Sequence, residues 1–503
     1  MKSNKFLTAA ILIVLAAYFV SAVFDLPQMG TRKIILASHE ALEGAPGHPP
    51  YWMALPFVLL LGAIAVLPLL PATEHWWDNN LHRFYVAGGL AALTLAYYLF
   101  LHGQPILAHW PAAHTAPPAL NGLNLTQTWE VLANAILSEY VPFIILLFSL
   151  YTIGGGIRIE GDLPAHPLTN TAILLIGALL ASFVGTTGAA MLLIRLLLET
   201  NSERKHVKHT VIFFIFMVCN CGGCLLPLGD PPLFLGYLMG VGFLFTLALW
   251  KEWLFINGAL AVIYYLWDRF WCYPHEERAD IVRDETQVRR LRFSGLWPNV
   301  LLLIGVIVSV GLLDPSKAVP GTDWRPWLYL REAVQLGLVA ISLALGSRAV
   351  RAANNFNYGA IIEVAALFFG IFICMQPPLQ ILAVEGPNLG LDQPWHYFWA
   401  SGGLSSVLDN APTYVVFFET AKSLTESRGL SPTEAGVAVR LLIAISLGSV
   451  FMGANTYIGN GPNFMVKAIA EKSGVRMPGF FAYMLYSGGV LVPLFILMTF
   501  LFL

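Results

Sequence analysis

The sequence predicts an all-α polytopic membrane protein, because it is apolar along its length, poor in charge and interrupted by Gly and Pro at related positions. Of its 503 residues, 57% are hydrophobic and 12% are charged, whereas soluble globular chains carry about 25% charged residues. The mean hydropathy is +0.67. The formal net charge of -2 offers no basic excess for a nucleic acid. We therefore expect the lipid bilayer, and not a polynucleotide, to surround this chain.

Apolar segments long enough to cross a bilayer recur along the chain. A membrane helix needs about 20 apolar residues, and about eleven segments meet that need. They lie near residues 6–25, 52–71, 84–102, 131–153, 211–245, 253–272, 296–313, 327–346, 358–376, 437–470 and 480–502.

Two further apolar stretches, 168–198 and 396–424, are interrupted at their midpoints by "VGTTGA" and "LDNAPT". We expect each to be a re-entrant hairpin that enters and leaves the membrane on one side. The spans 211–245 and 437–470 also contain polar breaks, which predicts two broken helices. Cytoplasmic loops are rich in Lys and Arg, and the basic loops share one side only if the hairpins make no net crossing. These loops are 201–209, 275–293, 347–351 and 471–476.

The hairpins and broken helices belong to an internal repeat. Glu139 precedes Gly185 by 46 residues, and Glu363 precedes Asp409 by 46. The segments "GCLLPLGDPPLF" (223–234) and "GANTYIGNGPNF" (453–464) share Gly, five residues, Gly, Asp or Asn, any residue, Pro, any residue and Phe. The hairpins open to opposite sides, so the repeats are inverted.

This repeat divides the chain into four parts. Residues 51–272 form the first inverted repeat and 296–503 the second, joined by a basic cytoplasmic linker at 273–295. Residues 1–50 contain either a signal peptide or a first membrane helix, followed by an external segment.

In inverted-repeat transporters the broken helices meet near the bilayer midplane and form the substrate and ion site. The four breaks contain no Arg or Lys, so we expect a site for a cation such as Na⁺, which prefers oxygen ligands. The ionisable candidate of the first broken helix is Asp230. The other candidate ligands are Thr186, Thr187, Asp409, Asn410, Thr413, Asn455 and Asn463.

Four acids lie within apolar segments, where carboxylates are costly and commonly mark ion paths or proton relays. Glu139 and Glu363 are the candidate proton relay, although each alone could be a solvated residue near the membrane boundary. Asp230 could instead cap the half helix that starts at Pro231. Asp409 could cap its hairpin arm in the same way. Competition between H⁺ and Na⁺ for one carboxylate is the simplest route to exchange.

Other chemistry is not expected. The three cysteines of "CNCGGC" (219–224) lie in an apolar helix without a nearby His and are interpreted as packing residues, so we expect neither a metal site nor a cofactor. No nucleophile and base stand at a usable spacing, so we do not expect an enzyme.

The segments "VGTTGAAMLLIRLLLETN", "GDPPLFLGYLMGV", "SSVLDNAPTYVVFF" and "MGANTYIGNGPNFMVKAIAEKSGVRMP" resemble the ion transporter superfamily. They are most similar to its NhaD-type sodium/proton antiporters and to the related putative citrate transporter family. The resemblance implies a homodimer in a bacterial inner (plasma) membrane, with a scaffold domain and a transport domain that moves as an elevator.

Carried over by motif, Asp409 and Asn410 match the family's Asp-Asn hairpin tip, and Asn220 and Asp230 match polar residues of the first broken helix. Glu139 and Glu363 match membrane acids of the antiporters. The first tip departs from the pattern, because Gly185, Thr186 and Thr187 stand where the antiporters carry a second Asp-Asn pair. We expect a secondary active transporter, with sodium/proton antiport as the leading function and ion-coupled uptake of citrate or another carboxylate as the alternative.

Overall fold

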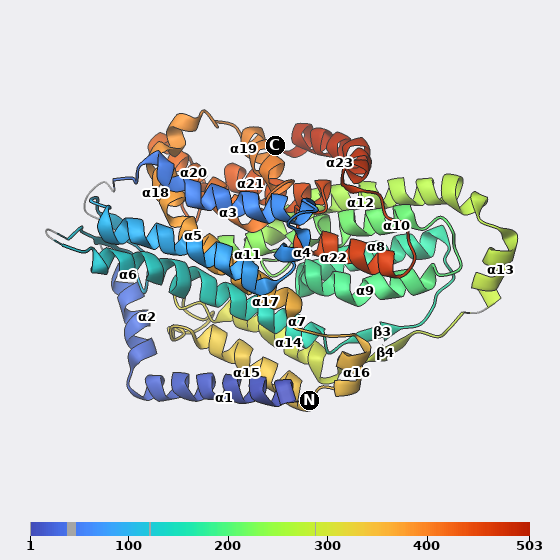
Figure 1. The fold of residues 1–503 in the computed structure, drawn as a ribbon, viewed down its shortest axis with the longest axis horizontal. Coiled ribbons are helices and arrows are strands. Elements are labelled where there is room, and N and C mark those ends of the chain that lie inside the picture. The colour runs from blue at the N-terminus through green and yellow to red at the C-terminus, as the bar shows by residue number, and fades with distance from the viewer. Residues whose placement is uncertain (1, 38–46, 120–121, 287) are drawn as a thin grey trace.

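The computed structural model describes residues 2–37, 47–119, 122–286 and 288–503, and its architecture is helical (Figure 1). Strands occur in the described residues only as short antiparallel pairs. The pairs are β1 (Ile106–Ala108) with β2 (His114–Ala116), β3 (Arg158–Glu160) with β4 (Arg292–Ser294), and β5 (Thr433–Glu434) with β6 (Val437–Ala438). The predicted all-α polytopic membrane protein is confirmed.

Seven helical segments of the described chain are long and apolar enough to cross a membrane, or up to eight if a pair bent by 43° at residue 375 counts as one span. The seven are Phe6–Val23, Tyr51–Leu69, Asn80–Phe100, Leu125–Gly154, Pro167–Val184, Phe245–His275 and Phe480–Phe502. The sequence predicted more crossings for two reasons. The broken spans 211–245 and 437–470 divide into short helices, and the predicted spans 296–313 and 327–346 form helices of only 17 and 16 residues. Lys208–Cys224, Leu296–Leu312 and Val439–Asn455 are apolar but shorter.

The first predicted hairpin is a pair of packed helices. They meet at Gly185, whose φ of 81° favours a residue without a Cβ. The first broken span follows as two short helices separated by an irregular segment that contains a 3₁₀ turn. The elements are α8 (Pro167–Val184), α9 (Thr186–Thr200), α10 (Lys208–Met217), η4 (Cys221–Cys224), α11 (Pro231–Leu238), α12 (Trp250–Trp267) and its π-helical extension η6 (Asp268–Cys272).

The second half of the chain has the same order of elements. A helix pair meets at residues 406–409, and a helix, a 3₁₀ turn and a second short helix follow. These elements are α19 (Pro394–Ser405), α20 (Asn410–Arg428), α21 (Val439–Phe451), η9 (Met452–Asn455), α22 (Gly461–Lys472) and α23 (Phe480–Phe502). The two sets pack against each other through α10 with α22, α9 with α22, and α11 with α20.

Most of the remaining helices pack among themselves, with α5 on α17 and α7 on α14 and α15, whereas α18 packs mainly on α20. At the edge of the molecule α1 lies along α15, where Tyr18 donates a hydrogen bond to the carbonyl of Leu328 (Figure 1). These helices are α1 (Lys2–Val23), α2 (Leu26–Ala37), α3 (Leu55–Val66), α4 (Glu74–Trp77), α5 (Asn80–Phe100), α6 (Leu125–Ala133), the π-helix η3 (Asn134–Tyr140), α7 (Val141–Gly154), α13 (Arg278–Thr286), α14 (Leu296–Leu312), α15 (Leu330–Leu345), α16 (Arg348–Ala353), α17 (Gly359–Cys374) and α18 (Gln376–Glu385).

Candidate functional site

The break in each broken helix follows from its residues. Gly223 and Gly229 approach so closely that a Cβ on Gly229 would collide with the carbonyl oxygen of Gly223, and Gly453 and Gly459 repeat this arrangement in the second half. After each glycine pair the chain is extended at one residue and then re-enters a helix at Pro or Gly. Those extended residues are Asp230 and Asn460, at the N-termini of α11 and α22.

Asp230 lies at the centre of a buried polar cluster. Its Oδ1 accepts hydrogen bonds from Thr186 Oγ1 at 2.9 Å and from Asn460 Nδ2 at 3.1 Å. Its Oδ2 accepts from Asn410 Nδ2 at 2.5 Å. All four residues are at most 5% exposed. The cluster thus joins both hairpin tips and both broken helices at one carboxylate.

The alternative interpretation of Asp230 as a helix cap does not describe this geometry. Its side chain makes no capping hydrogen bond to α11. Pro231 and Pro232 occupy the first two helical positions and lack N–H groups, so the usual donor at the second position is absent. The carboxylate is therefore available to the three donors from other elements.

Asp409 behaves in the opposite way. Its Oδ1 accepts a hydrogen bond from the N–H of Ala411 at 3.1 Å, which caps α20. Among the described residues, its carboxylate forms no hydrogen bond with the side chains that donate to Asp230. Asp409 nonetheless adjoins the cluster, because the next residue, Asn410, is one of the donors to Asp230. Thr413 donates to the carbonyl of Asp409 at 3.0 Å, and half-buried Thr187 makes none of the contacts around Asp230.

A second amide cluster lies beside the first. Asn220 Nδ2 donates to Asn463 Oδ1 at 2.8 Å, and Asn463 Nδ2 donates to the carbonyls of Gly453 and Thr456, each at 2.9 Å. The Oδ1 atoms of Asn220 and Asn455 are buried and accept no hydrogen bond from any described residue. Buried acceptors without a donor are uncommon and costly. Both oxygens are thus available to a cation.

The two halves make equivalent contacts behind the tips. Ser182 donates to the carbonyl of Gly222 at 2.5 Å, and Ser406 donates to the carbonyl of Met452 at 3.0 Å. Ser406 also accepts from Asn455 Nδ2 at 2.9 Å. These serines hold each hairpin against the broken helix of its own half, so the polar residues of the tips are positioned from both sides.

Sequence reasoning did not include Asn460 among the site residues. It occupies the position of Asp230 in the shared motif of 223–234 and 453–464. That equivalence was the signal that could have identified it, because a residue matching a site acid across an inverted repeat is expected at the same centre.

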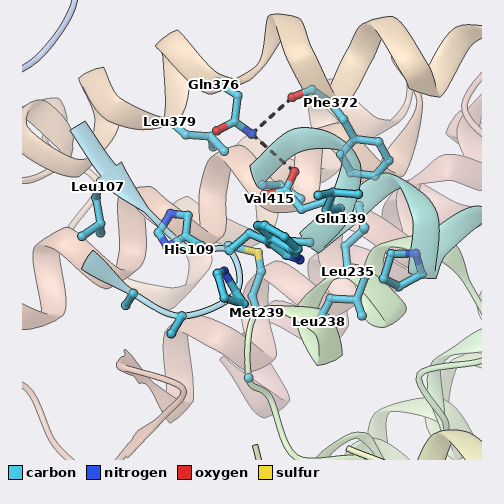
Figure 2. Close-up of a pocket in the computed structure, with 18 of the residues that line it drawn as sticks. Leu107, His109, Glu139, Leu235, Leu238, Met239, Phe372, Gln376, Leu379 and Val415 are labelled. Atoms are coloured by element: carbon cyan, nitrogen blue, oxygen red, sulfur yellow. Dashed lines mark hydrogen bonds between the residues drawn. The ribbon is translucent and has the colours of Figure 1, made fainter. Parts of the chain in front are cut away.

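The candidate proton-relay residues lie in different surroundings. Glu139, on η3, lines a cavity of about 470 Å³, and its Oε2 is 3.5 Å from Gln376 Nε2 (Figure 2). Glu363 pairs with Arg83, whose Nη1 lies 2.9 Å from its Oε2. Glu363 thus has a cationic partner, and the matched sequence positions do not give matched environments.

A second cavity, of about 1510 Å³, is lined by the basic loops that follow α9 and α22 and by the C-terminal parts of those helices. We call it the basic cavity. Its charged lining includes one carboxylate, Glu199, against a larger set of cations. These cations are Arg158, Arg195, Arg204, Lys205, Lys208, Lys472 and Arg476.

Comparison with known proteins assigns the family. No curated protein matches this chain. The family described as "Putative citrate transport" matches residues 47–503, which include every helix of both halves and all residues of the polar cluster. The predicted relation to the ion transporter superfamily is confirmed, and with the apolar helices the match indicates a multi-pass membrane transporter and not an enzyme. The chain belongs to the putative citrate transport family.

Proposed function

We propose that this protein is a cation-coupled transporter of citrate or a related carboxylate. The basic cavity is the observation that carries the proposal. The guanidinium of Arg195 donates hydrogen bonds to the carbonyls of Ala353 and Asn354. It forms no salt bridge with a described carboxylate. The same holds for Lys208, Lys472 and Arg476, which form no ion pair in the described chain. Arg158, Arg204 and Lys205 pair with carboxylates outside the lining, so the excess positive charge comes from the four cations without an ion pair. A cavity with an excess of one sign of charge concentrates ions of the opposite sign.

The walls of the basic cavity lead toward the polar cluster. Helix α9 begins at Thr186, within the cluster, and reaches the cavity at Met191 and Arg195. Helix α22 begins at Gly461 and reaches it at Met465. With a rise of 1.5 Å per residue, Arg195 stands about 14 Å along the helix from Thr186. An anion drawn into the cavity therefore lies within two or three helical turns of the cluster.

Cation coupling is supported by oxygen atoms that have no donor. Asn220 Oδ1 and Asn455 Oδ1 are buried beside the turns of the broken helices, where freed carbonyls are also present. Carboxylate, amide and carbonyl oxygens are the ligands that a hard cation takes. We propose Na⁺ as the coupling ion and the two asparagines as ligands, with Asp230 supplying the negative charge nearby.

Sodium/proton antiport is the second candidate. It is favoured by Asp230 and Asp409, two carboxylates in apolar segments that form no ion pair with a described Lys or Arg. The carboxylate proposal is preferred for two reasons. Asp230 already accepts hydrogen bonds from three donors, and the first hairpin tip carries Thr186 where the antiporters carry a second acid.

We also propose how the protein moves during transport, from the arrangement of the two hairpins. Each hairpin is a packed helix pair with its tip in the cluster, and Ser182 and Ser406 make equivalent contacts. These features support inverted repeats with re-entrant tips and an elevator-type displacement. We retain the homodimer and the inner-membrane location as expectations from the family resemblance.

Proteoliposomes with internal pyranine test the proposal. We expect saturable uptake of radiolabelled citrate that rises with an inward Na⁺ gradient. A sodium pulse without citrate should leave the internal pH unchanged. Alkalinisation by that pulse, without any citrate uptake, would establish antiport and overturn the carboxylate proposal.

Two variants connect the transport to the cluster. Asn220→Ala should raise the Na⁺ concentration needed for half-maximal citrate uptake, because it removes a buried oxygen. Asp392→Asn removes the charge of an acid that pairs with Arg428 at the surface and serves as the control with unchanged uptake. An unchanged sodium dependence in Asn220→Ala would exclude that asparagine as a ligand.

A further inference from the structure

Three carboxylates gather outside the transport site, where the linker between the two halves meets the first half. Asp162 follows strand β3, Glu203 lies in the turn after α9, and Asp284 lies on α13. One ligand oxygen from each lies within 4.8 Å of the others. Three segments that are distant in sequence therefore present their acids to one point.

Two of these carboxylates are buried and the third is half-buried, unlike ordinary surface acids. Asp162 is 3% exposed and Asp284 is 4% exposed, while Glu203 is half-buried. The Oδ1 atom of Asp162 is buried and accepts no hydrogen bond from a described residue. Leaving a buried acceptor beside two like charges is costly. The cluster therefore contains a buried oxygen, Oδ1 of Asp162, that has no partner among the described residues.

The neighbouring cations are engaged elsewhere. The guanidinium of Arg204 binds Asp268 at 2.5 and 3.0 Å and Glu276 at 3.3 Å. Arg289 lies 3.9 Å from Glu199. In the described residues, no Lys, Arg or His forms an ion pair with the three acids. The three acids are thus not neutralised by a salt bridge, although Arg289 and Arg204 lie near enough to attract them.

The remaining contacts orient the acids. Both carboxylate oxygens of Asp284 accept from the N–H of Ala165, at 2.9 and 3.2 Å. Ser202 donates to Glu203 Oε2 at 2.7 Å, and the N–H of Asp162 donates to the carbonyl of Arg289 at 2.9 Å. The pairing of β3 with β4 holds the segment before Asp162 beside the segment that follows α13.

We propose that Asp162, Glu203 and Asp284 bind a calcium ion that fastens the linker helix α13 to the segment entering α8 and to the turn leaving α9. Ca²⁺ binds oxygens at about 2.3–2.6 Å, so two of its ligands can stand up to about 5 Å apart. Mg²⁺ demands near-ideal octahedral geometry and dehydrates reluctantly, whereas Ca²⁺ accepts irregular sets of carboxylate oxygens. Three carboxylates from separate segments, with ligand oxygens within 4.8 Å of one another, therefore suit Ca²⁺ better.

The calcium would act on the connection between the halves and not on the transported ion. The linker bearing Asp284 joins the repeats, and Asp162 precedes the first hairpin directly. Fastening both to the turn at Glu203 holds the basic end of α9 in place, which restricts displacement of this hairpin relative to α13. The site is therefore independent of the proposed carboxylate substrate.

Calcium binding to the purified full chain in detergent tests the proposal. The protein is stripped with a chelator, transferred to citrate-free buffer and titrated with CaCl₂ by calorimetry. We expect one saturable site per chain, weaker binding of MgCl₂, and a higher melting temperature with calcium. Absence of saturable binding at millimolar calcium would overturn the proposal.

Matched variants locate the site. Asp162→Asn and Glu203→Gln should each weaken calcium binding at least about tenfold, because affinity follows the number of charged ligands. Glu277→Gln, which alters an exposed acid of the same linker, should bind calcium as the unmodified protein does. Half-buried Glu203 provides the informative change if Asp162→Asn does not fold. An unchanged isotherm in folded Glu203→Gln would exclude this cluster.

Discussion

The two break regions use the same backbone and distribute their charge differently. In the first half the carboxylate stands on the broken helix, at Asp230, and the hairpin tip offers the hydroxyl of Thr186. In the second half the broken helix offers the amide of Asn460, and the tip carries Asp409 and Asn410. The hydrogen bonds from Asn410 and Asn460 to Asp230 combine the two regions into one centre.

The first tip carries no acid but still reaches the common centre through Thr186. The carboxylate that the tip lacks is supplied by the adjacent broken helix, and the second half supplies amide donors to it. A nearly symmetric fold therefore holds an asymmetric site. The following experiments test which parts of this asymmetry matter.

The largest effect is expected from Asp230→Asn. The new amide places donor hydrogens against at least one of the three existing donors, and the charge is lost. Citrate uptake in proteoliposomes should fall at least about 100-fold, since each hydrogen bond to a charged group contributes about 1.5–3 kcal/mol. A monodisperse elution profile in detergent would verify that the variant folds.

The double variant Asp230→Asn/Asn460→Asp moves the carboxylate across the pseudo-symmetric pair. If the site needs one acid in the centre, uptake should recover in part relative to Asp230→Asn. Uptake that is equal in the single and double variants would show that the position of the acid, and not only its presence, is required.

The adjacent threonines of the first tip give a smaller and more selective effect. Thr186→Val removes a donor to Asp230 and should lower citrate uptake about tenfold or more. Thr187→Val makes the same chemical change one residue away, outside the cluster, and should leave uptake within about twofold of normal. Equal losses in both variants would contradict the assignment of Thr186.

Asp409→Asn should have a modest effect. Asparagine caps helices about as well as aspartate, so the bond to the N–H of Ala411 can be kept. We expect citrate uptake to fall by only a few-fold, measured beside Asp230→Asn under the same gradient. A complete loss of uptake would instead show that the second tip contributes an ion ligand.

The smallest effects concern the serines behind the tips. Ser182→Ala and Ser406→Ala each remove a hydrogen bond to a backbone carbonyl of the adjacent turn. Each should lower the stability of the folded protein by about 1 kcal/mol, measured as a shift in melting temperature. Similar shifts in melting temperature would show that the two serine contacts contribute equally to stability. Clearly unequal shifts would show that the contacts are equivalent in geometry but not in energy.

The sequence was sufficient to place the breaks and to bring Asp230 into the predicted polar cluster. Gly and Pro spacing located both turns, and the shared motif placed Asp230 beside the tips. The absence of N–H groups at Pro231 and Pro232 removes one of the two usual donors to a cap, which left only the N–H of Leu233 for that role. By contrast, Ala411 keeps an N–H, which made the cap by Asp409 available.

Partners across the fold were beyond sequence reasoning. Spacing matched Glu139 to Glu363, yet only Glu363 meets an arginine, because Arg83 comes from α5, outside the repeated motifs. The three acids of the linker cluster were not singled out either, since each belongs to a different polar loop or helix. Their proximity depends on the way β3 and β4 bring distant segments together.

The hydrogen bond from Asn410 to Asp230 pairs a donor of the second half with an acceptor of the first half. Each group thus has its hydrogen-bond partner within the protein. Parting the two residues exposes a donor and an acceptor together. A substrate carboxylate would satisfy the amide and a cation would satisfy the acid, whereas one without the other leaves a buried group unpaired at a cost of about 1–3 kcal/mol. In the proposed cation-coupled transport, this penalty would disfavour states that hold the substrate or the cation alone, so the hydrogen bond between the halves would itself set the stoichiometry.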